Sequence, residues 1–332
     1  MRITLAWAAA SFSVRDVTTG LRSALLRAGH QIRDYRLDNR LELISRAFPP
    51  EVQKEKDYEI ARMATENILA EATYHQADLV LIISGLWFHE IGLWLLQHYR
   101  IPTAIVLTES PYEDEAQRTW LSRYPEVMVF THERVSAATH GWHYLPHAYD
   151  PEVHRPVEPD PDEACDVLMV GTGFPERQAL LEQVNWDGIS LRLRGLWPTL
   201  TDASPLFPFY LAGCVRNADV PKLYAAAKVN LNPYRNGVAA ESLNPRAYEL
   251  AACGAFQVSD ERAESRELFG NSVPTYRDAA ELERMIRYYL KDEPARKARA
   301  DEARRRVQGQ TFDQRVQDLI GVVEGRIVAT VQ

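Results

Sequence analysis

Short apolar segments alternate with segments of helical periodicity along most of the chain. Residues 78–84 form a nearly continuous apolar run, which is typical of a parallel strand buried on both faces. Residues 17–28 place apolar side chains at i, i+3, i+4 and i+7, starting from Leu21. Strands that alternate with helices predict parallel sheets joined by crossover helices, so an α/β fold with doubly wound, Rossmann-like sheets is expected.

The alternation is interrupted near the middle of the chain by residues 145–163, which are rich in proline and aspartate and are typical of a linker. The length of 332 residues suits about two domains. We expect an N-terminal domain over residues 1–155, a C-terminal domain over residues 156–310 and a final helix within residues 311–332. Two such domains facing each other would form a cleft at the carboxyl ends of their strands, where ligands bind in these folds.

Composition excludes several classes of protein. The net charge of −8 argues against a protein that coats nucleic acid, because such binding depends on lysine and arginine. The three cysteines have no paired spacing, which argues against a disulfide scaffold or a structural zinc site. No apolar run approaches the roughly 18 residues of a membrane span, and residues 2–7 are typical of a strand and not of a signal peptide. We expect a cytoplasmic protein.

Residues 241–254 carry the most informative chemistry. Asn244 suits a helix N-cap, Pro245 the first helical position and Gly254 the residue after the helix end. The free N–H groups and the dipole of such a helix favour an anion at its start, for which a phosphate or diphosphate is the natural ligand. Glu241 in the preceding loop and Glu249 within the helix could accept hydrogen bonds from sugar hydroxyls on either side of a diphosphate.

Arginine and glycine near this helix suggest further contacts to a diphosphate. Arg246 lies in the first helical turn, where a cation is unfavourable unless an anion is bound, and a diphosphate could accept a bidentate contact from it. The alternatives are a solvated arginine or a surface ion pair with Glu249. Gly171 and Gly173 follow a predicted buried strand and would allow close backbone approach to a ligand, although the third glycine of a dinucleotide fingerprint is absent.

The two glutamates eight positions apart, together with residues 219–233 and 244–256, resemble the donor-site signature of GT-B glycosyltransferases of the group 1 type. Residues 244–256 are similar to the spore-maturation-protein-like branch of that superfamily. The resemblance covers roughly residues 165–320 and is weak in the N-terminal half.

This resemblance implies a GT-B architecture, in which the helix within residues 311–332 packs back toward the N-terminal domain. It implies a nucleoside diphosphate sugar as substrate, with a UDP-sugar expected, and no cofactor. Glu249 would bind the ribose and Glu241 the transferred sugar. The remaining donor-site residues fall into two groups: Leu243, Asn244, Arg246 and Arg177 at the diphosphate, and Trp197, Arg216 and Asn217 around the base. Trp197 could equally be an ordinary packing residue.

The acceptor side has weaker signals. Glu109 follows a predicted buried strand, where many proteins of the family place a histidine or aspartate that faces the reacting sugar. Burial could raise the pKa of this carboxyl group and make it a general base, which suits an inverting reaction, whereas paired glutamates are usual in retaining enzymes. His89 and His132 are further candidates, each with a structural role as the alternative.

The sequence therefore predicts a metal-independent glycosyltransferase with an unidentified acceptor. Asp160 and Asp162 lie in the linker, so a metal site there is not expected, and the helix start with its arginines could hold the diphosphate instead. A nucleotide-sugar epimerase of the same fold and a non-catalytic sugar-nucleotide or partner-binding module are the alternatives. Residues 296–306 are rich in arginine and are typical of a solvated helix face, although a modified base in nucleic acid is a conceivable acceptor.

Overall fold

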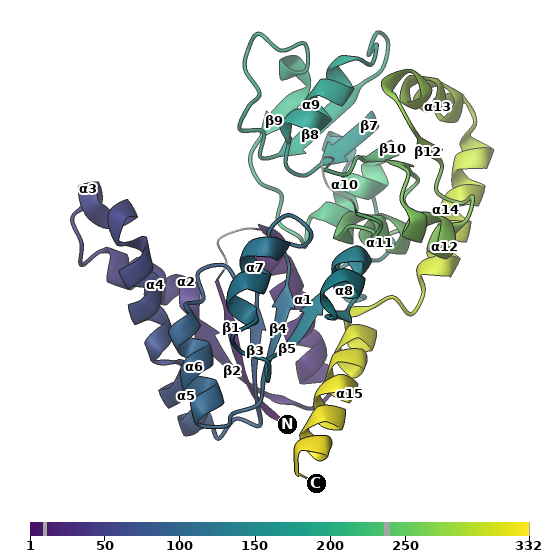
Figure 1. The fold of residues 1–332 in the computed structure, drawn as a ribbon. Helices are drawn as coiled ribbons and strands as arrows, with labels where there is room; N and C mark the ends of the chain where they lie inside the picture. Colours follow the sequence, from purple (N-terminus) through teal and green to yellow (C-terminus); the bar gives the residue numbers. More distant parts are fainter. Residues whose placement is uncertain (9–11, 236–239, 332) are drawn as a thin grey trace. The chain divides into compact units, whose positions relative to one another are not determined.

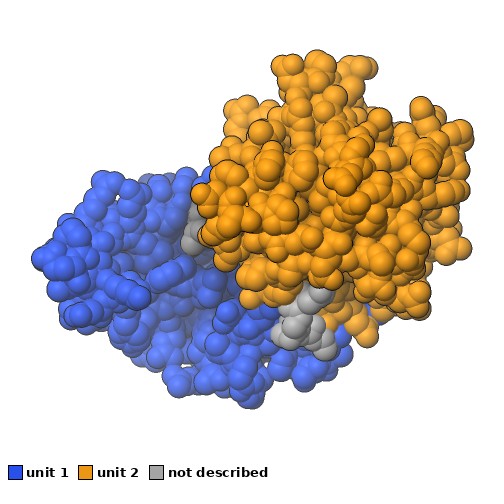
Figure 2. All heavy atoms as spheres, turned by 90° about the horizontal axis from the view of Figure 1, so that it is seen from above, with its two compact units in different colours: residues 1–146, 312–332 blue, residues 147–311 orange. Residues whose placement is uncertain are grey.

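The computed structural model describes residues 1–8, 12–235 and 240–331. The chain forms two compact units, which Figure 2 colours separately. Unit 1 comprises residues 1–146 and 312–332, and unit 2 comprises residues 147–311. No helix within the described ranges has the length and apolar character needed to cross a membrane.

Unit 1 is built on a six-stranded sheet in the order β2-β1-β3-β4-β5-β6. Every neighbouring pair of strands is parallel. All residues of β3 and β4 are buried, as expected for central strands covered on both faces. The strands are β1 (Arg2–Trp7), β2 (Gln31–Arg36), β3 (Leu79–Ile83), β4 (Thr103–Leu107), β5 (Met128–Thr131) and β6 (His143–Tyr144).

Helices surround this sheet (Figure 1). They are α1 (Phe12–Arg27), α2 (Leu37–Ser45), α3 (Pro50–Gln53), α4 (Asp57–Glu66), α5 (Ile68–His75), α6 (Glu90–His98), α7 (Asp114–Leu121), α8 (Arg134–His140) and α15 (Phe312–Val331). Helical periodicity predicts one helix over residues 55–74, but Asn67, with a ψ of 0°, separates α4 from α5. The helix α15 returns to unit 1 and packs on α1, where Arg27 forms an ion pair of 2.7 Å with Asp313.

Unit 2 contains a second six-stranded sheet, in the order β12-β11-β10-β7-β8-β9, and its neighbouring strands are also all parallel. Its strands are β7 (Cys165–Val170), β8 (Leu191–Gly195), β9 (Tyr210–Ala212), β10 (Ala227–Asn232), β11 (Gln257–Asp260) and β12 (Thr275–Tyr276). Its helices are α9 (Pro175–Glu182), α10 (Val220–Ala226), α11 (Pro245–Ala252), α12 (Ala263–Phe269), α13 (Ala279–Lys291) and α14 (Glu293–Val307). The doubly wound α/β architecture expected from the sequence is thus present in both units.

The segment expected to act as a linker belongs largely to unit 2, so the boundary between the units precedes His147 and does not fall at residues 155–156. The N–H group of Tyr149 donates to the carbonyl oxygen of Gln310 at 3.2 Å. This hydrogen bond links the segment in which the chain enters unit 2 to the segment in which it leaves unit 2. Asp150 and His154 are both buried. Proline-rich composition signals the absence of helix and strand here, but it does not reveal this packing.

Candidate active site

The carboxyl ends of the parallel strands of unit 2 meet at one edge of the sheet, which is where ligands bind in such folds. Gly171 follows β7 with a φ of +140°, and Gly195 ends β8 with a φ of +110°. A Cβ atom added to Gly195 would lie 2.4 Å from the carbonyl oxygen of Gly171. Glycine is therefore required at this edge, both for its conformation and for the close approach of the two loops.

The helix α11 begins at Pro245, which confirms the expected start. The side chain of Asn244 caps it, since its Oδ1 accepts a hydrogen bond of 3.0 Å from the N–H group of Ala247. Its Nδ2 donates to Oδ1 of Asn232, at the end of β10, at 2.8 Å. This pair of contacts fixes the positive end of the α11 dipole beside the carboxyl end of a central strand.

The guanidinium group of Arg246 points back to the strand ends. It donates to Oδ1 of Asn232 at 3.2 Å. Its Nη2 lies only 2.0 Å from the place that a Cβ atom on Gly171 would occupy. Arg246 is half-buried at this edge. The sequence left open a surface ion pair between Arg246 and Glu249, but the guanidinium group instead contacts Asn232 at the end of β10.

Two more arginines lie near the loop after β7. Arg177, in the first turn of α9, is 7% exposed and donates to the carbonyl oxygen of Thr172 at 2.8 Å. The guanidinium groups of Arg177 and Arg235 each lie 5.0 Å from the centre of the Phe174 ring. Arg235 was not predicted from the sequence. Its position shortly after the predicted strand that became β10 could have indicated a place at this edge of the sheet. This edge of unit 2 thus suits an anionic ligand.

A half-buried carboxyl group also lies at this edge. Asp260, at the end of β11, accepts a hydrogen bond of 2.8 Å from the N–H group of Tyr234. Burial raises the pKa of Asp260, and this outweighs the lowering by the charges of Arg262 and Arg177. The sequence gave no reason to single out Asp260, because a strand-terminal aspartate is common.

Glu249 lies within α11 with its side chain 14% exposed. The hydroxyl group of Tyr224 donates to Oε2 at 3.3 Å, and Nε2 of His154 lies 3.9 Å from Oε1. Burial, reinforced by the charge of Glu249, raises the pKa of Tyr224 well above its usual value, so the hydroxyl group stays protonated and can donate. The carboxylate is held in place yet still reaches solvent, as a group that receives ligand hydroxyls must.

The loop before α11 differs in part from expectation. Glu241 is exposed, and its carbonyl oxygen accepts a hydrogen bond of 3.2 Å from the N–H group of Glu264. The N–H group of Leu243, expected at the diphosphate, donates to Oε2 of Glu264 at 2.5 Å. A phosphate contact through Leu243 would therefore require this bond to break.

The residues expected around the base occupy different environments. Trp197 is 5% exposed within the core, and its ring packs so closely on Gly173 that an added Cβ atom would lie 2.2 Å from it. This burial fits a packing residue and does not present the ring for stacking. Arg216 is exposed and pairs with Asp219 at 2.7 Å. Asn217 lies at the site, since its Oδ1 is 3.1 Å from Nε2 of His154.

In unit 1, Glu109 lies just after β4 and its carboxylate accepts several hydrogen bonds. Its Oε1 accepts from the hydroxyl groups of Ser84 and Thr108, both at 2.6 Å. Its Oε2 accepts from the N–H group of Thr108 at 3.2 Å and from Nε2 of Gln117 at 3.3 Å. Glu109 thus links the ends of β3 and β4 at the edge where the sequence predicted an acceptor-side acid.

The two histidine candidates of unit 1 have structural contacts. Nδ1 of His89 accepts from the N–H group of Ile91 at 3.0 Å and caps α6, and burial lowers the pKa of His89. His132 is 4% exposed, and its Nδ1 lies 2.6 Å from the carbonyl oxygen of Leu145. Burial lowers the pKa of His132 to about 4. A helix cap and a buried neutral ring account for both residues without a catalytic role.

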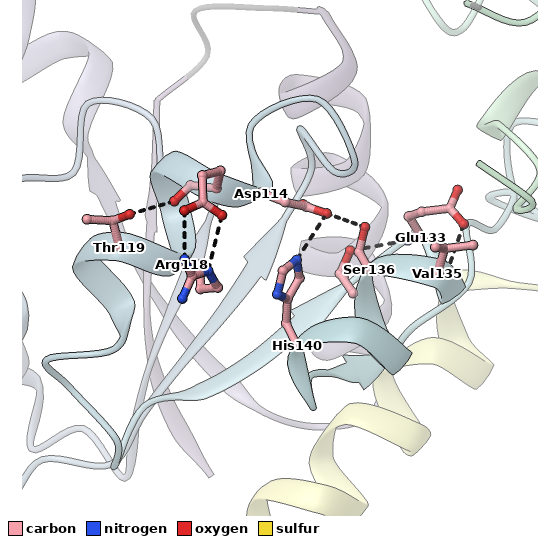
Figure 3. Close-up of polar contacts among 9 residues, drawn as sticks. Asp114, Arg118, Thr119, Glu133, Val135, Ser136 and His140 are labelled. Carbon is pink, nitrogen blue, oxygen red and sulfur yellow. Dashed lines mark hydrogen bonds and ion pairs between the residues drawn. The ribbon is translucent and has the colours of Figure 1, made fainter. Parts of the chain in front are cut away.

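A serine, a histidine and an aspartate also meet in unit 1, and Figure 3 shows their arrangement. The hydroxyl group of Ser136 donates to Oδ2 of Asp114, and Nε2 of His140 lies 3.7 Å from the same oxygen. In a nucleophilic triad the histidine lies between the serine and the acid. Here both residues approach the acid directly, so the cluster joins α7 to α8 and is not a triad.

Comparison with known proteins supports the sequence analysis. A family model described as glycosyl transferase-like matches residues 177–321. No curated protein sequence matches the chain. Among solved structures, sucrose-phosphate synthase from Thermosynechococcus elongatus is similar with a TM-score of 0.67 and 15% identity, covering 99% of this chain and 100% of that one.

Two other similar structures contain nucleotides. An alpha-glucosyltransferase in complex with UDP has a TM-score of 0.66 and 12% identity, covering 98% of this chain and 100% of that one. An Anabaena protein in complex with UDP-glucose has a TM-score of 0.65 and 12% identity, covering 97% and 100%. At these identities the likeness shows the fold, and the family model adds the activity. The protein is therefore a glycosyltransferase with the GT-B architecture.

Proposed function

We propose that the protein transfers a sugar from a nucleoside diphosphate sugar, bound by unit 2, to a hydroxyl group of an acceptor. The observation that carries this proposal is the start of α11, where Arg246 lies against Gly171 and Asn232. An anion bound there would meet both a helix N-terminus and a guanidinium group. Similar structures solved with UDP and UDP-glucose support a UDP-sugar as the donor.

In the proposed reaction, the bond between the anomeric carbon and the diphosphate oxygen breaks, and its electron pair leaves with the diphosphate. The acceptor oxygen bonds to the anomeric carbon and loses its proton. Negative charge develops on the leaving group, so preorganised positive groups accelerate the step. We propose that α11, Arg246 and Arg177 supply this stabilisation without a metal ion, while Glu249 binds the ribose and Glu241 the transferred sugar.

We propose Glu109 as the group in unit 1 that takes the proton of the acceptor. The hydrogen bonds from Ser84, Thr108 and Gln117 would fix its carboxylate in one orientation, which general base catalysis requires. A single base on the acceptor side suits inversion at the anomeric carbon. NMR of the product formed from a UDP-sugar of known configuration distinguishes inversion from retention.

Calorimetry with UDP, GDP and TDP tests the donor site directly. We expect at least one of these nucleotides to bind the wild-type protein and to bind Glu249→Ala more weakly. No binding by any of the three would contradict the proposal. Conversion of the donor sugar without transfer would favour a nucleotide-sugar epimerase, and binding without turnover would favour a non-catalytic module.

The position of the chain within the superfamily is a separate proposal. The likeness of residues 244–256 to the spore-maturation-protein-like branch supports placement there. That placement does not name the acceptor, which a screen of hydroxyl-bearing acceptors with a radiolabelled donor sugar would identify.

A further inference from the structure

Unit 1 contains a cavity of about 290 Å³ that the functions proposed above do not use. It lies at the amino ends of β5 and β6, where Val127, Val129 and His143 line it, whereas Glu109 follows the carboxyl end of β4. The amino and carboxyl ends of parallel strands lie at opposite edges of a sheet, so the cavity is separate from the proposed acceptor side. Its volume is at the lower end of the range for ligand sites, which suits a small molecule.

The wall of this cavity is basic, although the chain as a whole has a net charge of −8. Arg118 comes from the last turn of α7 and His140 from the last turn of α8 (Figure 3), where the helix dipoles favour cations. His143 and Arg326 add two basic side chains from β6 and α15. Within the part of the chain that the structure describes, no aspartate or glutamate lines the cavity. The lining therefore favours an anionic ligand.

The two arginines of this wall can contact a ligand although both have acidic neighbours. Arg118 pairs with Glu115 at 2.6 Å, and Nη2 of Arg326 lies 3.4 Å from Oε2 of Glu126. Both glutamates are exposed and lie outside the lining. Exposed ion pairs are weak, so each guanidinium group can share its donors with an anion in the cavity. The charge of Arg326 reaches the cavity, since it adds to the lowering of the pKa of His143 by burial.

Apolar and aromatic groups form much of the remaining lining. Leu121 and Val127 are buried, and Tyr124 and Trp142 are half-buried. The ring centre of Trp142 lies 4.5 Å from that of His140. A flat apolar group can pack against such side chains while its charged group meets the arginines. We propose that the cavity binds a small organic anion, in which one ring carries a carboxylate or a phosphate group.

The test compares four probes at this cavity. Phenyl phosphate and benzoate carry both a ring and a charge, benzyl alcohol carries the ring alone, and inorganic phosphate carries the charge alone. In protein with ¹⁵N-labelled tryptophan, the indole signal of Trp142 can be assigned by its loss in Trp142→Phe. We expect this signal to give a dissociation constant about tenfold lower, or more, for at least one of the two ring anions than for benzyl alcohol or inorganic phosphate, as hydrogen bonds to charged groups allow.

The tighter of the two ring anions distinguishes a phosphate from a carboxylate ligand. No shift of the Trp142 signal with either ring anion would overturn the proposal. Binding of both ring anions no tighter than that of benzyl alcohol or of inorganic phosphate would overturn it as well, because the ligand would then not need both its ring and its charge.

Substitutions of arginine test the role of the charged wall. Arg118→Gln and Arg326→Gln should each weaken the tighter ring anion by about tenfold and leave benzyl alcohol unchanged, which shows that the cavity is intact. Arg123→Gln is the matched control, because Arg123 is an exposed arginine after α7 that pairs with Glu90 and does not line the cavity. An equal loss in Arg123→Gln, or no loss in either of the other two variants, would contradict the proposal.

UDP separates this cavity from the proposed donor site. Trp142 belongs to unit 1, so saturating UDP should leave the dissociation constant of phenyl phosphate at the Trp142 signal unchanged. Competition between the two would show that phenyl phosphate binds at the donor site and would overturn the proposal. A protein that binds no UDP would count against the donor site alone.

Discussion

The guanidinium group of Arg246 occupies the space that a side chain on Gly171 would need, with Nη2 2.0 Å from the position of an added Cβ atom. Arg246 belongs to α11 and Gly171 follows β7, so the contact brings a helix start to the end of a strand distant in sequence. The absence of a side chain on Gly171 thus determines where this cation can lie.

We predict that Gly171→Ala weakens UDP binding by about tenfold, because Arg246 must move away from the strand ends and hydrogen bonds to a charged ligand are strong. The φ of +140° at Gly171 also makes the substitution cost stability. Gly188→Ala is the control, since Gly188 has a φ of +73° and an added Cβ atom would meet nothing within 4 Å. Calorimetry and urea denaturation should show a loss of stability in both variants but a loss of affinity only in Gly171→Ala.

A second prediction concerns the chemistry of Arg246 itself. Arg246→Ala should weaken UDP binding by roughly 10- to 100-fold, and Arg246→Lys should fall in between, because lysine keeps the charge but lacks the bidentate fork. Uridine has no phosphate, so its affinity should stay the same in all three proteins. If calorimetry showed equal losses for UDP and uridine, Arg246 would have a structural role and no role at the diphosphate.

The parts of this site that the sequence predicted are those determined by local chemistry. The cap at Asn244, the helix that starts at Pro245 and the glycine after β7 each depend on a few neighbouring residues. His154 and Asn232 were not predicted, because their roles depend on contacts between segments distant in sequence. Such polar residues look ordinary in the sequence until the fold brings them to the site.

Trp197 is a residue that the sequence analysis did single out, but whose role the sequence could not decide. A tryptophan at the end of a strand is compatible with both stacking on a ligand and packing in the core, and only its 5% exposure distinguishes the two. In unit 1 the apolar run over residues 78–84 predicted the buried strand β3, whereas the short β6 was not predicted, because two residues carry too little pattern.

A third prediction tests Glu109 as the proton acceptor. Glu109→Gln removes the basic group and should lower kcat by about 10²- to 10⁴-fold. UDP affinity, measured by calorimetry, should not change, because Glu109 belongs to unit 1. Ser84→Ala is the control that removes one hydrogen bond to the carboxylate and should have a much smaller effect. Turnover of Glu109→Gln within a few-fold of wild type would show that Glu109 only links β3 to β4.

A fourth prediction follows from His132, whose buried ring has a pKa of about 4 instead of the usual 6.5. Above pH 6.5 the ring is neutral in both the folded and the unfolded state. Between these values only the unfolded state takes up the proton, so the free energy of unfolding falls as the pH falls, by up to about 3 kcal/mol. His132→Asn keeps an N–H donor for the carbonyl oxygen of Leu145 but cannot titrate. Its free energy of unfolding should therefore not show the part of the fall between pH 6.5 and pH 4 that His132 causes.

Urea denaturation at pH 7 and pH 4.5 measures this effect as the difference between the two proteins. The other titrating groups contribute to both, so they cancel in the comparison. The same pH dependence in His132→Asn as in the wild-type protein would contradict the prediction.

The last prediction concerns the attachment of α15 to unit 1. A Cβ atom added to Gly20 on α1 would lie 2.3 Å from the ring of Phe312, at the start of α15. Gly20→Ala should therefore cost about 1–3 kcal/mol of stability, because the ring must shift within a packed contact. Gly321→Ala is the matched control on α15, where an added Cβ atom would meet nothing within 4 Å. This substitution should raise the free energy of unfolding by about 0.5–1 kcal/mol, because alanine favours a helix interior over glycine. Urea denaturation that showed equal effects of the two substitutions would mean that α15 does not pack on α1 in solution.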